Sequence, residues 1–360
     1  EISECLVGSE MCIRDRMWDQ LLDQMSFEDM SLLVNLGGWQ TAQIDSVGKV
    51  ATSDCDGPAG LNNFVTKTYG TSYPTEVLLA QTWNKELARE VGESMGQEFS
   101  DVKNYGWYGP AMNTHRSAFA GRNFEYYSED GVLSGYMATN AILGAEEYGV
   151  YAYMKHFALN DQETNRTEML CTWANEQSIR EIYLKPFEMS VKEGGAKAVM
   201  SSFNYIGTQW AGGTSALCNT VLRDEWGFRG FVLTDYFGVY GYMDSDMGIR
   251  GGTDCMLVAY DTETNHVTDT TSATGVLAMR QACKNIMYTV VNSRAYDPEN
   301  LTEGLMNWQI MAIVIDVIFA ALIIFLEVLA IKGFKKDQAA APVVAPVEAA
   351  EAQTEEKKEE

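Results

Sequence analysis

The sequence predicts an α/β protein: a parallel sheet closed into a TIM-type (β/α)8-like barrel, then one transmembrane helix and a disordered tail. Three observations lead to this prediction. Strand-like and helix-like segments alternate at least six times over about 280 residues, as they do in parallel sheets. The strand-like segments are short continuous apolar runs, as expected where both faces of a sheet are buried. Residues 310–331 are almost entirely apolar.

The expected helices and strands follow in a regular order. The capping-box-like sequence Ser26-Phe27-Glu28-Asp29 begins a helix, and Gly37 and Gly38 end it. Leu79, Trp83, Leu87 and Val91 recur at every fourth position and predict one long helix over residues 74–102. Further helices are expected over residues 129–148 and 175–193, the second bent at Pro186. Strands are expected over residues 49–55, 105–112, 150–157, 196–204, 231–235 and 253–257.

A parallel sheet can close into a barrel or remain an open, doubly wound sheet. An open dinucleotide-binding sheet should carry G-x-G-x-x-G after an early strand, and the chain contains neither this motif nor a P-loop. The barrel is therefore favoured. The seven cysteines form no CxxC pair, and the three histidines offer no zinc-site spacing. A net charge of −24 disfavours nucleic acid. We expect no cofactor, no metal and no nucleic-acid partner.

Polar residues stand where several of these strands end. They are Asp56, Arg122 in the segment after the strand 105–112, Lys155, His156, Asn204 and Asp235. The carboxyl ends of parallel strands meet at one rim, where α/β barrels carry their chemistry. Charged groups beside aromatic residues suit a sugar, which offers hydroxyls for hydrogen bonding and apolar ring faces for stacking. Two alternatives stay open: Asp235 could cap a following helix, and Lys155 and His156 could have only structural roles.

Four motifs carry a more specific signal. They read DGPAG at residues 56–60, GRNFEYYSED at 121–130, KHFALNDQETNR at 155–166 and LTDY at 233–236. Together, and in this order, they resemble glycoside hydrolase family 3, the β-glucosidase-like enzymes, over about residues 17–300. Members that cleave N-acetylglucosaminides carry Pro-Gly-His-Gly after Lys-His-Phe. Residues 158–161 read Ala-Leu-Asn-Asp instead, which favours the β-glucosidase and β-xylosidase side.

The resemblance implies roles for single residues in hydrolysis of terminal non-reducing β-D-glycosides. Asp235 matches the nucleophile, whose carboxylate forms a glycosyl ester through an oxocarbenium-like transition state. The residues that match sugar-holding positions are Asp56, Arg122, Lys155 and His156. Two positions depart from the family. Tyr236, also a sugar-contacting position, replaces the usual Trp that flanks the ring, and Phe203 replaces a common Tyr, so one hydroxyl near the nucleophile is absent.

Retaining hydrolysis also needs a second carboxyl group about 5 Å from the nucleophile. In β-glucosidase-like members this glutamate comes from a separate α/β sandwich domain, and the apolar span follows the barrel directly here. We therefore expect an N-terminally truncated, inverted-order, membrane-anchored member whose missing N-terminal sandwich domain supplies the acid/base. The 360 residues alone should hydrolyse little. The alternatives are a β-xylosidase of the same family, a non-catalytic membrane-tethered carbohydrate-binding protein, and a soluble enzyme whose last helix packs on the barrel.

Five segments are expected along the chain. They are a non-native leader (1–16), the barrel (17–300), a linker (301–309), a transmembrane helix (310–331) and a disordered charged tail (332–360). The 22 residues 310–331, almost all apolar, are long enough as a helix to cross a lipid core of about 30 Å. Asp316 within them costs about 3 kcal/mol, which the surrounding Ile, Leu and Phe should outweigh. Lys332, Lys335 and Lys336 follow the span, whereas residues 296–309 contain no Lys or Arg. This asymmetry predicts a single-pass protein of the cell membrane, with a cytoplasmic C-terminus and an extracytoplasmic barrel.

Overall fold

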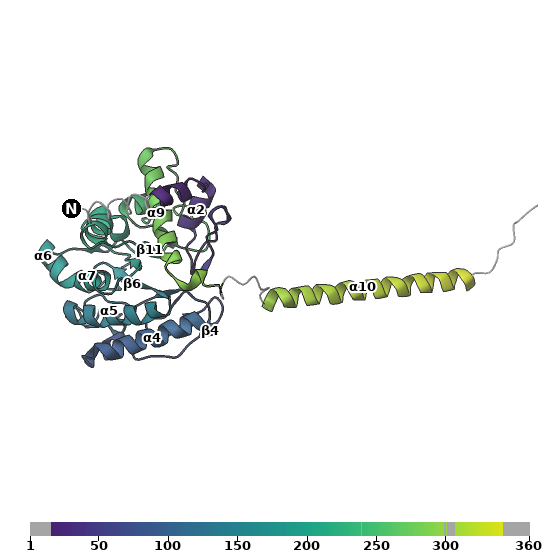
Figure 1. Ribbon diagram of the computed structural model, residues 1–360, viewed down its shortest axis with the longest axis horizontal. Helices are drawn as coiled ribbons and strands as arrows, with labels where there is room; N and C mark the ends of the chain where they lie inside the picture. Colours follow the sequence, from purple (N-terminus) through teal and green to yellow (C-terminus); the bar gives the residue numbers. More distant parts are fainter. Residues whose placement is uncertain (1–15, 239, 299, 301–306, 341–360) are drawn as a thin grey trace, which may run out of the picture. The chain divides into compact units, whose positions relative to one another are not determined.

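The computed structural model describes residues 16–238, 240–298, 300 and 307–340. The chain divides into two compact units, Glu1–Leu301 and Thr302–Glu360. The first unit carries a β-sheet surrounded by helices, and the described part of the second is the helix α10 (Asn307–Ala340) (Figure 1). Residues 1–15 of the expected leader and 341–360 of the expected tail lie outside the described residues.

The main sheet contains six strands that pair in parallel, each with the next one along the chain. They are β2 (Thr52–Asp56), β5 (Gly106–Tyr108), β6 (Tyr151–Phe157), β8 (Ala198–Ser201), β11 (Phe231–Tyr236) and β12 (Cys255–Leu257). The short antiparallel strands β1 (Gln40–Thr41), β3 (Asn62–Asn63) and β4 (Thr68–Tyr69) extend it beside β2. A small second sheet joins β7 (Cys171–Thr172), β9 (Tyr205–Ile206) and β10 (Gln209–Trp210). The TIM-like architecture is confirmed, with six parallel strands in the described residues where eight were predicted.

The segment from Gly37 to Thr41 closes the ring of strands. The amides of Gly37 and Gly38 donate to the carbonyls of Met256 (2.8 Å) and Val258 (2.9 Å), at the β12 edge. The carbonyl of Trp39 accepts from the amide of Asp54 (2.9 Å), at the β2 edge. A Cβ on Gly37 would come within 2.3 Å of a cysteine Sγ of β12, and one on Gly38 within 2.6 Å of a backbone nitrogen. These glycines therefore do more than end a helix, because the closing backbone can approach β12 only without side chains.

Helices connect the parallel strands and cover the outside of the barrel. They are α2 (Phe27–Asn35), α3 (Glu76–Gln81), α4 (Lys85–Asp101), α5 (Gly131–Glu147), α6 (Glu176–Ser178), the π-helix η3 (Ile179–Tyr183), α7 (Lys185–Lys192), the π-helix η5 (Ala216–Glu225), α8 (Ser245–Gly251) and α9 (Ala273–Val291). Short 3-10 helices are η1 (Asp45–Val47), η2 (Asn123–Glu125), η4 (Ala211–Gly213) and η6 (Arg294–Tyr296). The predicted capping box of α2 is confirmed: Ser26 and Asp29 exchange two hydrogen bonds of 3.0 Å.

Two predicted helices are interrupted. The segment 74–102 is not one helix, because the backbone leaves the helical region at Trp83 (φ 54°), whose side chain is 74% exposed. Asn84 then caps α4 by accepting from the amide of Leu87 (3.1 Å). The four-residue spacing of apolar residues continues across Trp83, so it predicted one helix. Such a spacing does not reveal a helix cap that lies between two consecutive helices. The segment 175–193 is divided into α6, η3 and α7, with Pro186 in the first turn of α7.

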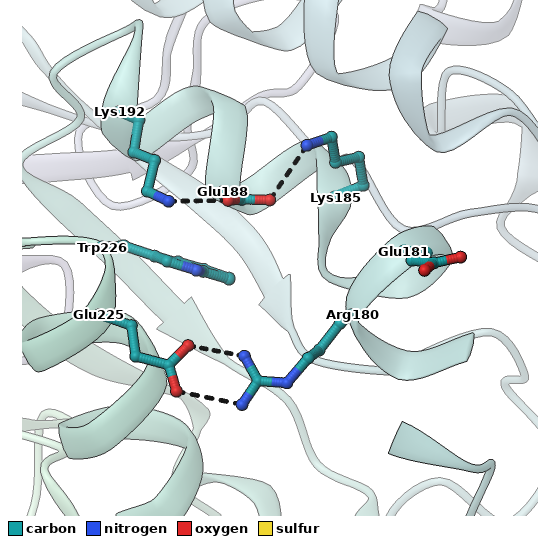
Figure 2. A pocket seen from close by; sticks show the side chains of 7 residues that line it. All are labelled: Arg180, Glu181, Lys185, Glu188, Lys192, Glu225 and Trp226. Atoms are coloured by element: carbon teal, nitrogen blue, oxygen red, sulfur yellow. Dashed lines mark hydrogen bonds and ion pairs between the residues drawn. The ribbon is translucent and has the colours of Figure 1, made fainter. Parts of the chain in front are cut away.

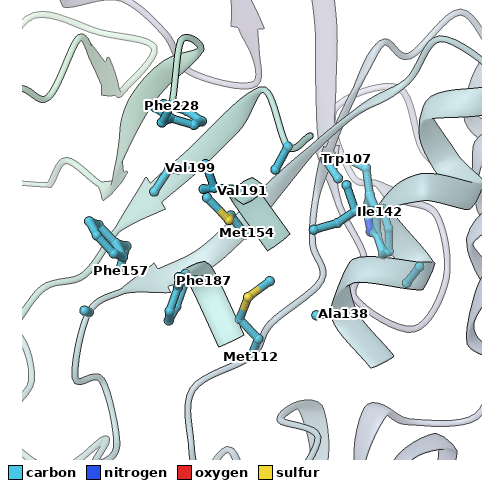
Figure 3. Packing of buried hydrophobic residues seen from close by; sticks show 14 of the residues in the cluster. Trp107, Met112, Ala138, Ile142, Met154, Phe157, Phe187, Val191, Val199 and Phe228 are labelled. Atoms are coloured by element: carbon cyan, nitrogen blue, oxygen red, sulfur yellow. The ribbon is translucent and has the colours of Figure 1, made fainter. Parts of the chain in front are cut away.

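A large apolar layer lies between the sheet and its outer helices (Figure 3). Trp107, Met154 and Val199 project from neighbouring strands against Ile142 of α5 and Phe187 of α7. All five side chains are essentially buried. Helices α4, α5 and α7 lie side by side outside this layer (Figure 1). Alternate residues of the same strands point into the barrel, so each strand is buried on both faces.

The barrel interior holds a buried polar group below the rim. Asp54 is 1% exposed and accepts hydrogen bonds of 2.6 Å from the hydroxyls of both Tyr151 and Tyr153. Burial raises the pKa of Asp54, against the opposing effect of the two hydroxyls. Asp54 and Tyr153 each precede a rim residue, Asp56 or Lys155, by two positions on the same strand. The network therefore ties β2 to β6 directly beneath the site described next.

The second unit is a helix that is long and apolar enough to cross a membrane. Its candidate span, Ile310–Asp337, has a mean hydropathy of 2.8, and none of that window is buried against protein. The helix includes residues 307–309 of the expected linker and continues to Ala340, so residues 332–340 are helical and not disordered as predicted. The lysines and alanines after the span have high helix propensity, which explains why the helix continues into the segment that was predicted to be disordered.

Candidate active site

Asp235 lies at the carboxyl end of β11, at the rim of the barrel. One carboxylate oxygen, Oδ1, accepts from the amide of Tyr236 (2.7 Å). The other, Oδ2, is buried, has no hydrogen bond from any described residue, and lies 3.7 Å from Nε2 of His156. The next helix, α8, begins ten residues later and is capped by Asp244. The alternative that Asp235 is a helix cap is therefore excluded.

His156, at the end of β6, is held on every side. Its amide donates to Oδ1 of Asn113 (2.7 Å) and its carbonyl accepts from Nδ2 of the same residue (2.9 Å). The guanidinium of Arg122 contacts Nε2 (3.1 Å) and the hydroxyl of Tyr126 contacts Nδ1 (3.1 Å). Because a guanidinium can only donate, Nε2 accepts and Nδ1 carries the proton. The imidazole is 1% exposed, so it is a fixed, neutral group.

Arg122 is anchored by two acids. It forms an ion pair with Glu125, one turn further along the same loop, and lies 3.8 Å from a carboxylate oxygen of Glu163. Arg122 and Glu125 come from the GRNFEYYSED motif after β5, and Glu163 comes from the motif that begins at the end of β6. The ion pairs thus join two motifs that lie far apart in the sequence and aim the guanidinium at His156.

Burial dominates the electrostatics of this group. It raises the pKa of Asp235, while the positive charges of Arg166, Arg122 and Lys155 and the amide of Tyr236 act in the opposite direction. Burial also lowers the pKa of His156 well below its ordinary value, and the neighbouring cations Arg122, Lys155 and Arg166 lower it further. The site therefore combines a neutral imidazole with a carboxylate whose ionisation depends on the surrounding cations.

Asp56 and Tyr236 are linked through Trp39. The indole Nε1 of Trp39 donates to Oδ2 of Asp56 (3.3 Å), and its ring centroid lies 6.2 Å from that of Tyr236. The hydroxyl of Tyr236 shares a hydrogen bond with that of Tyr260 (2.8 Å), which raises the pKa of Tyr236 to about 12. Phe64 packs edge-on against Trp39 at 4.8 Å. This aromatic group forms a second part of the rim, next to the carboxylate of Asp56.

Lys155 and Asn204 occupy different environments. Lys155 is 4% exposed at the end of β6, so it is not a solvated surface charge, and its charge acts on both His156 and Asp235. Asn204 follows β8 and is fully buried. Its amide donates to the carbonyl of Ala158 (3.1 Å) and the hydroxyl of Thr172 (2.9 Å). Asn204 therefore holds the loop after β6 in place.

Several residues of the site were not singled out from the sequence. Asn113 and Tyr126 orient His156, and Asn160 donates to the hydroxyl of Tyr126 (3.0 Å). Arg166 stacks on Phe203 and carries a buried N–H with no partner among the described residues. Tyr126, Asn160 and Arg166 lie inside the recognised motifs, which was the available signal, whereas Asn113 and Trp39 carried none beyond being polar or aromatic.

A separate depression lies on the outer helical layer (Figure 2). It encloses about 270 Å³ and is lined by Arg180, Glu181, Lys185, Glu188, Lys192, Glu225 and Trp226. Arg180 forms two hydrogen bonds with Glu225 (2.6 and 3.1 Å), and Glu188 bridges Lys185 (3.1 Å) and Lys192 (2.8 Å). These charges satisfy one another, so the depression is a structural junction between η3, α7 and η5. Within the described ranges, no cluster of acidic, His and Cys residues is arranged to hold a metal ion.

Comparisons with known proteins agree with the fold and the rim. Residues 44–278 match the family model described as "Glycosyl hydrolase family 3 N terminal domain". The closed α/β barrel with a charged, aromatic rim is typical of the α/β-barrel enzymes. The match to the family model shows that the chain belongs to glycoside hydrolase family 3. It is 38% identical over 241 residues to the β-glucosidase A of Butyrivibrio fibrisolvens, covering 66% of this chain and 28% of that protein. It is 39% identical over 201 residues to a β-glucosidase of Ruminococcus albus, covering 56% and 21%.

Solved structures show the same barrel. The β-glucosidase 3B of Thermotoga neapolitana, solved in complex with α-D-glucose, is 32% identical with a TM-score of 0.68, over 80% of this chain and 44% of that one. The β-glucosidase of Kluyveromyces marxianus, in complex with glucose, is 28% identical with a TM-score of 0.70, over 80% and 35%. The chain therefore spans less than a third of these two curated relatives and less than half of these two solved ones.

Proposed function

We propose that this chain is the barrel part of a retaining β-glycosidase that removes terminal non-reducing β-D-glucosyl units. The observation that carries the proposal is the carboxylate of Asp235, which has one buried oxygen without a hydrogen bond at a rim surrounded by cations. The relatives named above are β-glucosidases, which favours glucose over xylose as the sugar.

In the proposed reaction, a carboxylate oxygen of Asp235 attacks the anomeric carbon of the substrate. The bond from that carbon to the leaving oxygen breaks, and its electron pair leaves with that oxygen, which takes a proton from a general acid. Water then attacks the same carbon and gives a proton to the group that acted as the general acid, the glycosyl ester bond breaks, and its electron pair returns to Asp235. Two inversions leave the product with the configuration of the substrate.

The other rim residues would bind the sugar. Arg122 and Lys155 supply N–H donors to hydroxyl groups, and Asp56 supplies an acceptor. The neutral imidazole of His156 can release its contact with Arg122, and Nε2 can then accept a hydrogen bond from one sugar hydroxyl. Trp39 and Tyr236 offer ring faces for stacking beside Asp56.

The proton donor is expected from a part of the protein beyond this chain. Two carboxyl groups within the rim motifs are already engaged: Glu125 forms an ion pair with Arg122, and Glu163 forms one with Arg166. The curated relatives are several times longer than the matched segment, which leaves room for a further domain that supplies the acid/base glutamate. The proposal therefore divides the reaction between Asp235 on this barrel and a carboxyl group elsewhere.

A substrate that needs no proton donor tests the role of Asp235 in this chain alone. Incubation with 2,4-dinitrophenyl 2-deoxy-2-fluoro-β-D-glucoside should add one fluoroglucosyl group to the peptide that contains Asp235. Dinitrophenolate leaves without protonation, and the fluorine slows hydrolysis of the ester, so the adduct should accumulate. Peptide mass spectrometry measures it, and the corresponding xylosyl reagent tests the β-xylosidase alternative.

The matched control is Asp261→Asn, an exposed acid in the loop after β12, which should label like the unaltered chain. Label on another residue, or label that survives in Asp235→Asn, would contradict the assignment of the nucleophile. Rapid multiple turnover of an alkyl β-glucoside by this chain alone would contradict the division of the reaction, because such a leaving group requires a proton.

For the second unit, we propose that α10 anchors the protein in a membrane, with the lysines after the span on the cytoplasmic side. The apolar window contains only one acidic residue before Glu327, and no part of it is buried against protein. Insertion into a lipid core would remove the apolar surface of such a helix from water while its backbone hydrogen bonds stay satisfied.

Flotation with phosphatidylcholine vesicles tests the anchor. The purified chain should rise with the vesicles through a density gradient and should need detergent for release. The variant Ile318→Lys/Ile323→Lys, which places two charges in mid-span at a cost of roughly 3 kcal/mol each, should remain at the bottom. Equal recovery of both proteins in the vesicle fraction would argue against insertion of the helix.

A further inference from the structure

We propose that a cavity between the first turns of α4 and α5 is a secondary binding site for a β-linked glucan chain, separate from the rim around Asp235. The cavity encloses about 370 Å³, which is within the range of small-ligand sites. The choice of a β-linked glucan as the ligand rests on the proposed function. The cavity and the side chains that line it are independent of that proposal.

Trp83, in the turn between α3 and α4, lines this cavity. Its φ of 54° lies in the left-handed region, which is unfavourable for a bulky side chain and which glycine adopts freely. Thr82 holds the turn, because its hydroxyl donates to the carbonyl of Leu79 (2.6 Å) and accepts from the amide of Asn84 (3.1 Å). The indole is 74% exposed, so packing does not compensate for the backbone strain. Glycine would suit the turn better, and an exposed indole at such a position indicates a role in binding.

Tyr136, in α5, supplies a second aromatic ring to the lining. Its side chain is 47% exposed, as expected for a ring that presents one face to solvent. Leu133 and Met137 lie on the same face of α5 and line the cavity beside it. Exposed aromatic rings next to apolar side chains suit the apolar ring faces of a sugar, as they do at the rim.

The polar groups of the cavity are suited to a neutral ligand with many hydroxyls. Oδ1 of Asp130 caps α5 by accepting from the amides of residues 132 (2.8 Å) and 133 (3.1 Å), which leaves Oδ2 as an acceptor. The ammonium of Lys85, the indole N–H of Trp83 and the hydroxyl of Tyr136 form no hydrogen bond or ion pair within the described part of the chain. One cation and one carboxylate balance each other, so the lining does not favour an anion. Several donors and an acceptor remain for sugar hydroxyls.

The cavity lies at the same end of the barrel as the rim. Asp130 is the last residue of the GRNFEYYSED motif, which also supplies Arg122, and α5 begins directly after it. Helix α4 lies beside α5 (Figure 1), and each of the two helices ends shortly before the next strand begins. Their first turns are therefore at the rim end, as in other β/α barrels. A glucan chain held there would raise the local concentration of chain ends near Asp235.

A glycine variant tests the site without endangering the fold. The chain is first labelled at Asp235 with the dinitrophenyl fluoroglucoside, so that the rim already holds a sugar. Titration with cellotetraose, followed by saturation-transfer difference NMR, then gives the dissociation constant. Trp83→Gly should weaken binding at least about tenfold, because it removes a stacking surface. It should keep the urea midpoint, because glycine fits the backbone at this position. It should also keep the rate at which Asp235 is labelled.

Two further variants separate stacking from other effects. Trp83→Phe, which keeps an aromatic face, should weaken binding by less than about threefold. Leu277→Ala, at a position of α9 that is 65% exposed and outside the cavity, is the control and should bind like the unaltered chain. Maltotetraose, which contains the same sugar in α-linkage, should bind more weakly than cellotetraose. Equal binding of the two would overturn the assignment of a β-linked ligand.

The label and the titration distinguish this inference from the proposed function. Normal labelling of Asp235 with equal cellotetraose binding in the unaltered chain and Trp83→Gly, or with no binding in either, would overturn the inference alone. Absence of label, together with binding that depends on Trp83, would overturn the proposed function and leave the cavity as a carbohydrate-binding site. Absence of both would overturn both proposals.

Discussion

Replacing Asp235 with glycine should reduce release of dinitrophenolate from 2,4-dinitrophenyl β-D-glucoside by at least about 10⁴-fold, the scale on which removal of a nucleophile acts. The rim would keep its other contacts, because Asp235 donates nothing and only accepts from the amide of Tyr236. The substitution opens a space beside His156 and Arg122 that a small anion can fill. Azide should therefore restore part of the rate and yield α-D-glucosyl azide, since it attacks from the side that the carboxylate occupied.

The configuration of that product distinguishes the nucleophile from a bystander. The absorbance of dinitrophenolate gives the rate of its release, and proton NMR gives the anomeric configuration of the azide product. Asp261→Gly, in the exposed loop after β12, should retain the rate and show no response to azide. A β-configured azide, or full activity in Asp235→Gly without added anion, would show that another group attacks the sugar.

The position of the rim could be predicted because parallel strands bring their carboxyl ends to one edge. Up to 113 residues separate Arg122, His156 and Asp235 in the sequence. In the structure, Nε2 of His156 lies 3.1 Å from the guanidinium of Arg122 and 3.7 Å from Oδ2 of Asp235. The alternation of apolar strands and helices is enough to predict that these residues meet at one rim, without any knowledge of side-chain contacts. The roles of these residues remain proposals, since contact alone does not establish chemistry.

The residues that hold the rim in shape were harder to find. Asn113 grips the backbone of His156, and Trp39 joins Asp56 to Tyr236, but neither has a sequence signal that separates it from an ordinary polar or aromatic residue. Trp39 also belongs to the segment that closes the barrel, which appeared in the sequence only as the end of a helix. Long-range backbone pairing of this kind leaves no periodic pattern in the sequence.

Asp254, at the opposite end of the sheet, is another residue whose role the sequence alone did not reveal. Like Asp235 it is an acid next to the apolar residues of a short strand, but it precedes β12, whereas Asp235 lies near the carboxyl end of β11. It is 3% exposed and accepts from the guanidinium of Arg223 (2.6 Å), the amide of Val232 (2.7 Å) and the side-chain amide of Asn285 (2.8 Å). One carboxylate thus joins η5, the beginning of β11 and α9. Its environment is that of a structural acid.

Asp254→Ala should therefore lower the free energy of unfolding of the barrel by about 3–5 kcal/mol, because it leaves a buried guanidinium and a buried amide without their acceptor. Burial raises the pKa of Asp254 to about 6, against the effect of Arg223, so the experiment belongs at pH 7.5, where the carboxylate is ionised. Urea unfolding followed by tryptophan fluorescence measures the change, with Asp261→Ala as the exposed control. Asp254→Asn, which keeps the volume and one acceptor, should lose less. A loss below about 1 kcal/mol for Asp254→Ala would mean that Arg223 is satisfied by the carbonyls of Gly230 and Gly252 alone, to which it also donates at 2.8 and 3.1 Å.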